Sequence, residues 1–219
     1  MQIAYKAVIF DMDGTLLDTL EDLADAMNRT LEDRGFPIHS VKAFRYFVGN
    51  GVAKLVSRTL PPEKRNSELT AECLEAFLTE YDRNWNRKTR LYDGVPELLD
   101  ALTAKEIPMA VFTNKPQHFA ELCMREFLPK WEFGVVLGQR EGYPMKPDPA
   151  VPREIAEHLD IAPEAFLYLG DSDADMKTAV NTNMFPVGAL WGFRSEKELR
   201  ESGAVKVIRQ PMELLKFLN

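Results

Sequence analysis

Short apolar segments that end abruptly in polar residues alternate with amphipathic segments along most of this chain. The first of them, Ala4–Phe10, is rich in β-branched and aromatic residues and stops at Asp11, which is typical of a buried strand. Further strands are predicted over Met109–Thr113, Phe133–Leu137, Phe166–Gly170 and, late in the chain, within residues 185–190 and 205–208. Strands that alternate with helices form right-handed β–α–β units, so the sequence predicts an α/β fold with a parallel sheet.

The long stretch from residue 17 to residue 89 interrupts this alternation, because it contains helical patterns and no recognisable strand. One apolar helix face at its start is formed by Leu20, Leu23, Ala24, Met27 and Leu31, at intervals of three and four residues. Leu-, Ala- and Glu-rich segments continue this helical character to about residue 88. We therefore expect a helical insert at 17–89 and a main domain made of residues 1–16 and 90–219.

The charge balance and the cysteine content exclude several classes of protein. The chain has 27 basic and 34 acidic residues, a net charge of −7 and a pI of about 5.1, so nucleic acid and anionic membranes are poor partners. Its two cysteines make neither a disulfide framework nor a zinc site. No apolar run is long enough for a transmembrane helix, and the N-terminal segment lacks the cleavage site of a signal peptide. We expect a cytoplasmic protein with no nucleic-acid or membrane partner.

Polar clusters follow three of the predicted strands at the point where each strand ends. Asp11 and Asp13 follow the first strand, Thr113 and Asn114 end the second, and Asp171 follows Phe166–Gly170. In an open α/β sheet, ligands bind beyond the carboxyl ends of the strands. A fourth polar residue, Lys146, lies in a Pro-rich loop. We expect these side chains to converge on one site.

The residue types in these clusters indicate a metal ion and a phosphoryl group. Three carboxylates at one site would repel one another, and a hard divalent cation with oxygen ligands, such as Mg²⁺, resolves this repulsion. A hydroxyl from Thr113, an amide from Asn114 and a positive charge from Lys146 are suited to phosphoryl oxygens. Gly14 allows a sharp backbone turn that points amide N–H groups at an anion.

Simpler interpretations exist for each cluster taken alone, because an Asp after a strand is often a helix N-cap and Asp13-Gly14 is a common turn. An EF-hand needs Gly at the sixth position and Glu at the twelfth, whereas a loop that starts at Asp171 has Met176 and Thr182 there. A phospho-acceptor receiver domain would need adjacent acids after the first strand. The ordered set of four clusters argues against all of these interpretations.

The ordered motifs DMDGT, FTN, KPDP and GDSDADM resemble those of the haloacid dehalogenase superfamily of phosphatases. The resemblance implies a Rossmann-like, doubly wound parallel core with a helical cap domain inserted after the first motif, the layout already indicated by the periodicity. It also implies that Asp11 is a nucleophile that forms an aspartyl-phosphate. Asp13 would be the general acid and base, and Thr113 and Lys146 would hold the phosphoryl group.

The resemblance also implies a Mg²⁺ site. Its residues would be Asp11, Asp13 through the backbone carbonyl, Asp171 and Asp175. Asp173 matches no essential position of the motif and is interpreted as charge at a helix N-terminus. Asp13 argues against a dehalogenase, because a halide leaving group needs no proton. Leu23 stands where β-phosphoglucomutase-like members carry a His, which argues against a mutase.

The segment Phe47–Val56 resembles the cap loop of phosphoglycolate phosphatases, as do DGVPELL and WGF. We expect its residues Gly49, Asn50 and Gly51 to present backbone N–H groups to a small acid, together with Gly14 and Asn114 of the core. Arg45 and Lys54 are candidate partners for a substrate carboxylate. Two departures from the family pattern are Asn183, expected to end a helix in a left-handed turn, and Asp148, expected to place negative charge near Lys146.

The sequence thus predicts a Mg²⁺-dependent phosphomonoester hydrolase of a small phosphorylated metabolite, with 2-phosphoglycolate as the leading substrate. The alternatives are pyrophosphate, a nucleoside monophosphate or a sugar phosphate as substrate, and beyond these a mutase or a non-catalytic phosphometabolite sensor. The sequence leaves open whether the protein is a monomer or a homodimer.

Overall fold

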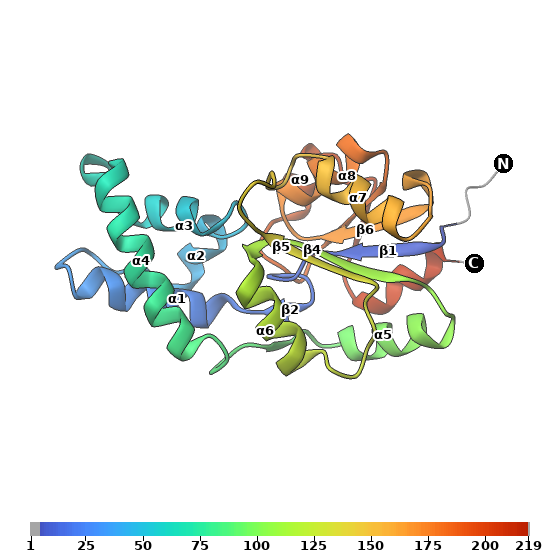
Figure 1. Ribbon diagram of the computed structural model, residues 1–219, viewed down its shortest axis with the longest axis horizontal. Helices are drawn as coiled ribbons and strands as arrows, with labels where there is room; N and C mark the ends of the chain where they lie inside the picture. Colours follow the sequence, from blue (N-terminus) through green and yellow to red (C-terminus); the bar gives the residue numbers. More distant parts are fainter. Residues whose placement is uncertain (1–4, 219) are drawn as a thin grey trace.

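A six-stranded sheet forms the centre of the computed structural model, which describes residues 5–218 (Figure 1). All neighbouring strands are parallel. Their order is β5 (Val135–Gln139), β4 (Met109–Pro116), β1 (Ala7–Phe10), β6 (Phe166–Gly170), β7 (Phe185–Ala189) and β8 (Lys206–Ile208). Because the order runs outward from β1 in both directions, the carboxyl ends of β4, β1 and β6 lie side by side at the switch point where such sheets bind ligands.

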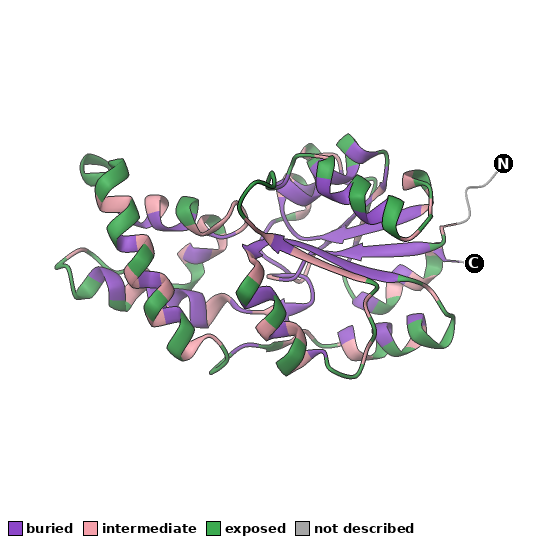
Figure 2. Cartoon of the chain, viewed as in Figure 1, coloured by how far each residue is buried: buried purple, intermediate pink, exposed green. Residues whose placement is uncertain are grey.

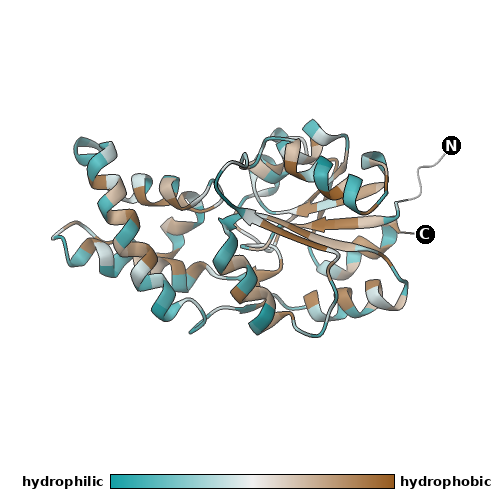
Figure 3. Cartoon of the chain, in the orientation of Figure 1, coloured by the Kyte–Doolittle hydropathy of each residue, from teal (hydrophilic) through white to brown (hydrophobic). Residues whose placement is uncertain are grey.

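Helices cover both faces of this sheet, and alternate residues of each strand pack against them. Val8 and Phe10 of β1 share a core with α5 (Val95–Ala104), α6 (Gln117–Phe127) and the 3₁₀ segment η3 (Pro211–Phe217). Ala7 and Ile9 pack on the other face with α7 (Ala150–His158) and α8 (Asp173–Thr182). A 3₁₀ turn, η2 (Pro163–Ala165), precedes β6, and α9 (Glu196–Glu201) lies between β7 and β8. The strands are buried and apolar, as Figures 2 and 3 show, and the predicted doubly wound α/β fold is confirmed.

A separate group of helices lies beside the carboxyl edge of the sheet (Figure 1). It consists of α1 (Leu20–Glu32), α2 (Val41–Phe47), α3 (Val52–Thr59), the 3₁₀ turn η1 (Pro62–Lys64) and α4 (Ser67–Asn84). These helices have their own apolar cluster, which includes Met27, Phe44 and Phe77. Phe119 of α6 and Phe193 also belong to this cluster, so the helical group is packed onto the rest of the chain by apolar contacts.

Two short strands within and next to the helical stretch differ from the sequence prediction. Residues 17–89 were expected to contain no strand, yet β2 (Leu17–Asp18) pairs antiparallel with β3 (Arg90–Leu91). Strands of two residues show no alternation that a sequence pattern can reveal. This pair ties together the two connections between the helical group and the sheet, and we propose 1–16 with 90–219 and 17–89 as the two domains.

Several element boundaries also differ from those predicted. Strand β4 continues beyond Thr113 to Pro116, with an irregular register after Phe112, and Pro116 directly precedes α6 instead of forming its first turn. Strand β5 begins two residues later than expected, and Ala4 lies outside the described residues. Asn183 has a φ of 62° and ends α8 in the left-handed conformation, as predicted. No helix among residues 5–218 is long and apolar enough to cross a membrane.

A buried carboxylate fastens the second connection to the first helix of the group. Asp22 of α1 accepts hydrogen bonds from the backbone N–H of Lys88 at 2.9 Å, and from the backbone N–H and the hydroxyl of Thr89, each at 2.8 Å. Removing this acceptor would leave buried donors without a partner, which costs more than the hydrogen bonds contribute on average.

We expect Asp22→Ala to lower the free energy of unfolding by about 1–3 kcal/mol, because buried backbone donors lose their acceptor. Urea denaturation measures this change. The matched control is Asp25→Ala on the same helix, which removes only a partly exposed ion pair with Lys88 and should cost no more than about 1 kcal/mol. Equal losses for the two variants would contradict the assigned role of Asp22.

Candidate active site

The polar residues predicted from the strand ends lie together at the carboxyl edge of the sheet. Asp11 follows β1, Thr113 lies in β4 and Asp171 follows β6, and these three strands are neighbours. Each of the three side chains is almost completely buried. Parallel strands in register therefore place a hydroxyl and two carboxylates within one small region.

Lys146 connects two of the acids in this region. Its Nζ lies 2.8 Å from Oδ1 of Asp11 and 2.7 Å from Oδ1 of Asp175, and only 5% of the residue is exposed. The backbone N–H of Lys146 donates to Oδ1 of Asn114 at 2.9 Å. Asn114 thus holds the Pro-rich loop against β4, and the loop in turn holds the ammonium group beside Asp11.

The acidic cluster carries more negative charge than Lys146 neutralises. Asp11, Asp171 and Asp175 each offer an oxygen within 4.8 Å of the others. Burial and the charge of Asp175 raise the pKa of Asp11 to about 7, although Lys146 opposes this shift. Burial, Asp175 and Asp11 likewise raise the pKa of Asp171 well above its usual range. Oxygen donors with excess negative charge and no His or Cys fit a hard divalent cation such as Mg²⁺.

Hydrogen bonds fix the orientation of the two acids that follow β6. Oδ2 of Asp171 accepts from the backbone N–H of Phe193 at 2.7 Å, and Oδ1 accepts from the hydroxyl of Thr15 at 3.3 Å. Oδ2 of Asp175 accepts from the backbone N–H and the hydroxyl of Ser172 at 2.9 and 2.6 Å, which forms the capping box of α8. Both oxygens of Asp175 are therefore engaged, one by the cap and the other by Lys146.

The two other acids singled out in the sequence lie outside this cluster. Asp173 is in the first turn of α8, where its carboxylate pairs with Lys177 at 2.8 Å. Asp148 is exposed and accepts a hydrogen bond from the backbone N–H of Ala150 at 2.9 Å. The expectation that Asp148 adds negative charge beside Lys146 gains no support, because this carboxylate is engaged by its own loop.

Asp13 is held by two groups, one of which the sequence analysis missed. Its Oδ1 accepts from the hydroxyl of Thr19 at 2.8 Å and lies 3.0 Å from Nζ of Lys115. Lys115 is 4% exposed and also donates to the hydroxyl of Tyr81 in α4 at 2.8 Å. Burial acts to lower the pKa of Lys115, but the negative charge of Asp13 leads the influences that outweigh it and raise this pKa. The only signal in the sequence was its place directly after Thr113 and Asn114.

Gly14 has a structural role that differs from the one expected. Its φ is +83°, and a Cβ added there would lie 2.3 Å from Oδ2 of Asp171. Its backbone N–H donates to the carbonyl of Leu17 at 2.9 Å, so this N–H is used by the turn and does not point at an anion. Gly14 therefore allows the first motif to approach Asp171 closely.

The loop between α2 and α3 reaches the core through its backbone. The carbonyl of Gly49 accepts from Nδ2 of Asn114 at 3.1 Å, and both Gly49 and Gly51 line a pocket next to Asp11. The side chain of Asn50 instead accepts from Arg58 at 2.7 Å. Within the expected Gly49–Gly51 segment, the glycines are thus the residues that face the pocket.

The two cations proposed for a substrate carboxylate lie elsewhere. Arg45 donates to the carbonyl of Gly192, and the side chain of Lys54 is exposed on α3. Neither of them lines the pocket. Side-chain direction on a short helix depends on where the helix docks, and the sequence pattern alone does not give that direction.

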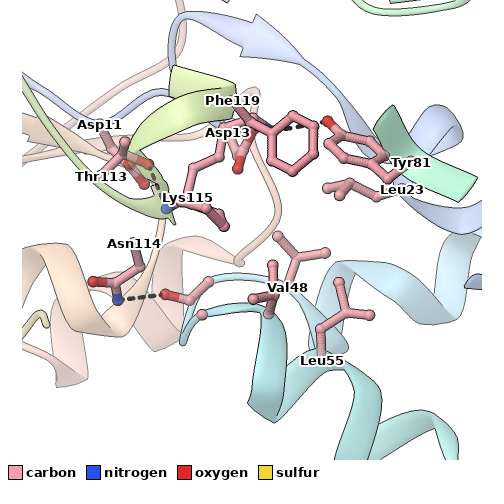
Figure 4. A pocket seen from close by; sticks show the side chains of 14 residues that line it. Asp11, Asp13, Leu23, Val48, Leu55, Tyr81, Thr113, Asn114, Lys115 and Phe119 are labelled. Carbon is pink, nitrogen blue, oxygen red and sulfur yellow. Dashed lines mark hydrogen bonds and ion pairs between the residues drawn. The ribbon is translucent and has the colours of Figure 1, made fainter. Parts of the chain in front are cut away.

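The pocket lies between the helical group and the sheet (Figure 4). It contains about 480 Å³ of empty space, counting the open solvent at its mouth. The core side supplies polar groups from Asp11, Asp13, Thr113, Asn114 and Lys115. The opposite wall is mostly apolar and includes Leu23, Val48, Val52 and Leu55. A small molecule with a charged end fits this division between the two walls.

Comparison with known proteins supports the same conclusion. The family model for haloacid dehalogenase-like hydrolases matches residues 8–189. A phosphoglycolate phosphatase of Psychrobacter arcticus is 32% identical, covering 97% of this chain and 95% of its own length. A phosphoglycolate phosphatase of Nitrosococcus oceani is 30% identical, covering 98% of this chain and 96% of its own length.

A solved structure shows the same fold over nearly the whole chain. This protein from Lactobacillus delbrueckii subsp. bulgaricus, provisionally assigned as a phosphoglycolate phosphatase, superposes with a TM-score of 0.92. It is 30% identical, and the match covers 99% of each chain. The resemblance seen in the sequence motifs is confirmed: the chain is a phosphatase and belongs to the family of haloacid dehalogenase-like hydrolases.

Proposed function

We propose that this phosphatase hydrolyses 2-phosphoglycolate in a Mg²⁺-dependent reaction that passes through an aspartyl-phosphate on Asp11. The observation that carries the proposal is the position of Asp11, whose Oδ1 lies 2.8 Å from Nζ of the buried Lys146. A carboxylate beside a fixed cation is suited to attack phosphorus while the cation offsets charge on the phosphoryl oxygens.

The chemistry divides into two steps. In the first, a carboxylate oxygen of Asp11 bonds to phosphorus while the bond from phosphorus to the ester oxygen breaks and Asp13 gives that oxygen a proton. In the second, Asp13 takes a proton from water, the water oxygen bonds to phosphorus, and inorganic phosphate leaves Asp11. Thr113 and Lys146 bind phosphoryl oxygens in both steps.

The metal would be held by the carboxylates of Asp11 and Asp171 and the backbone carbonyl of Asp13. When bound, Mg²⁺ offsets the negative charge of the phosphoryl group and of these acids. Asp175 supports the site by holding Lys146 and the Ser172 turn. Their excess negative charge without metal, described above, supports this assignment.

The pocket and the relatives favour a small acid as substrate. Gly49 and Gly51 line the pocket and are suited to present backbone N–H groups to it, and the listed relatives at about 30% identity are named phosphoglycolate phosphatases. Leu23, which also lines the pocket, carries no proton, in contrast to the His of mutases. The cytoplasmic location and the oligomeric state, monomer or homodimer, stay predictions.

We expect phosphate release to be fastest with 2-phosphoglycolate in a panel with pyrophosphate, glucose phosphates and nucleoside monophosphates, by tenfold or more in kcat/KM. Asp11→Asn should lower this activity by at least about 10³-fold, because the amide is a poor nucleophile. Chelation of the metal should abolish turnover in the wild type. Retained turnover in Asp11→Asn would contradict the aspartyl-phosphate, whereas broad hydrolysis would contradict only the substrate.

Metal binding should change stability through Asp171. At about one hundred times its Kd, Mg²⁺ should raise the free energy of unfolding of the wild type by about 2.7 kcal/mol, and Asp171→Asn should lose most of this gain. In chelator, Asp171→Asn should be more stable than the wild type at pH 8. The raised pKa of Asp171 means that its folded form favours the proton, so the wild type loses stability as pH rises through that pKa.

Thermal unfolding from pH 4.5 to pH 8, with Mg²⁺ or chelator, checks both expectations. The advantage of Asp171→Asn in chelator should shrink toward low pH, where Asp171 is neutral. A Mg²⁺-induced rise in Tm that is the same in both proteins would place the metal elsewhere.

Gly14→Ala tests the close approach between the first motif and Asp171. The added Cβ would lie 2.3 Å from Oδ2 of Asp171, and the φ of +83° is unfavourable for alanine. The resulting displacement should lower kcat/KM by on the order of 10²-fold. Gly142→Ala is the control, because it shares the positive φ but has open space around it. Full activity of Gly14→Ala would contradict this assignment.

A further inference from the structure

We propose that Lys115 forms, together with Tyr81, the subsite that binds the carboxylate of the substrate's leaving group. The inference rests on the proposed function and adds to it the residue that selects the substrate. Lys115 comes from β4 of the core and Tyr81 from α4 of the helical group, so the subsite spans the two walls of the pocket.

Lys115 is the one cationic side chain among the described residues that line the pocket. Lys146 lies behind Asp11 and is paired with Asp11 and Asp175. Arg45 is bound to the carbonyl of Gly192, and Arg58 donates to Asn50 and to the carbonyl of Phe47. A carboxylate that enters this pocket therefore meets a positive charge at Lys115.

The position of Lys115 relative to Asp13 matches the shape of the proposed substrate. Its Nζ lies 3.0 Å from Oδ1 of Asp13, the group assigned to protonate the ester oxygen. In 2-phosphoglycolate a single carbon separates that oxygen from the carboxylate. When the ester oxygen is beside Asp13, the carboxylate is consequently within reach of the neighbouring ammonium group.

The ammonium group retains a donor for such a ligand. A lysine has three N–H donors, and the described residues supply two acceptors, Asp13 at 3.0 Å and the hydroxyl of Tyr81 at 2.8 Å. The Tyr81 ring centroid lies 4.9 Å from Nζ, which further restricts the position of the side chain. The third donor is available to a carboxylate oxygen.

The surroundings of Lys115 make this charge selective. The residue is 4% exposed, and the facing wall contains Leu23, Val52 and Leu55. In such a setting an ion pair is screened less by water than at the surface. A substrate with a neutral group at the same position would leave the ammonium without its second anion, and would gain nothing from the subsite.

The test compares 2-phosphoglycolate with 2-hydroxyethyl phosphate, in which an alcohol replaces the carboxylate. Lys115→Met keeps the length of the side chain and removes its charge. We expect kcat/KM for 2-phosphoglycolate to fall by about 10–100-fold, mainly through KM, while the neutral ester changes little. Activity toward the neutral ester shows at the same time that the variant is folded and that Asp13 still works.

Three further variants sharpen this comparison. Lys115→Arg should recover part of the preference for the carboxylate, and Tyr81→Phe should reduce the preference less than Lys115→Met does. Lys197→Met, on exposed α9 and far from the described pocket lining, is the matched control for loss of a lysine charge. An unchanged ratio for this control, with a reduced ratio for Lys115→Met, supports the subsite.

Several results would overturn the inference. Equal losses on both esters in Lys115→Met would mean that Lys115 only positions Asp13. A loss confined to pyrophosphate would mean that the subsite binds a phosphate leaving group and not a carboxylate. A wild type that hydrolyses both esters equally well would refute the subsite while leaving the phosphatase in place, whereas a wild type that hydrolyses neither would refute the proposed function itself.

Discussion

The double ion pair of Lys146 with Asp11 and Asp175 is the interaction on which the rest of the site depends. Buried acids at the tips of β1 and β6 raise one another's pKa, and the single ammonium group offsets only part of this charge. The surrounding structure holds these groups in place against their repulsion: Asn114 fixes the Lys146 loop, and the Ser172 cap fixes Asp175. The fold therefore keeps a repulsive arrangement that a bound cation and a phosphoryl group can use.

The sequence predicted the main fold and the position of the site because both depend on simple periodicity. Strands buried on both faces appear as short apolar runs, and the residue after each run marks the carboxyl edge of the sheet. Two-residue strands such as β2 have no period, so their pairing could not be predicted. Lys115 was missed because β4 extends past Thr113, and the direction of a side chain in an irregular strand end depends on register. Arg45 and Lys54 were misplaced because the docking of α2 and α3 determines where their side chains point.

The two walls of the pocket divide the work between them. The core wall carries the acids and cations needed for phosphoryl transfer, and it is formed by strand ends whose spacing the sheet fixes. The helical wall contributes apolar surface and the hydroxyl of Tyr81, which meets Lys115 across the pocket. Chemistry that is common to a family can thus remain in the sheet, while the preference for one substrate is set where the insert meets it.

The shared apolar cluster of the helical group has a thermal consequence. Phe119 and Phe193, which belong to the core by sequence, are buried among the side chains of the insert. Any movement that separates the insert from the sheet must expose these rings to water, and exposure of apolar surface carries a positive heat-capacity change. The free energy of such an opening would vary with temperature along a curve and weaken in the cold. Access to the pocket would then respond to temperature in a way that a purely polar contact between the two parts would not.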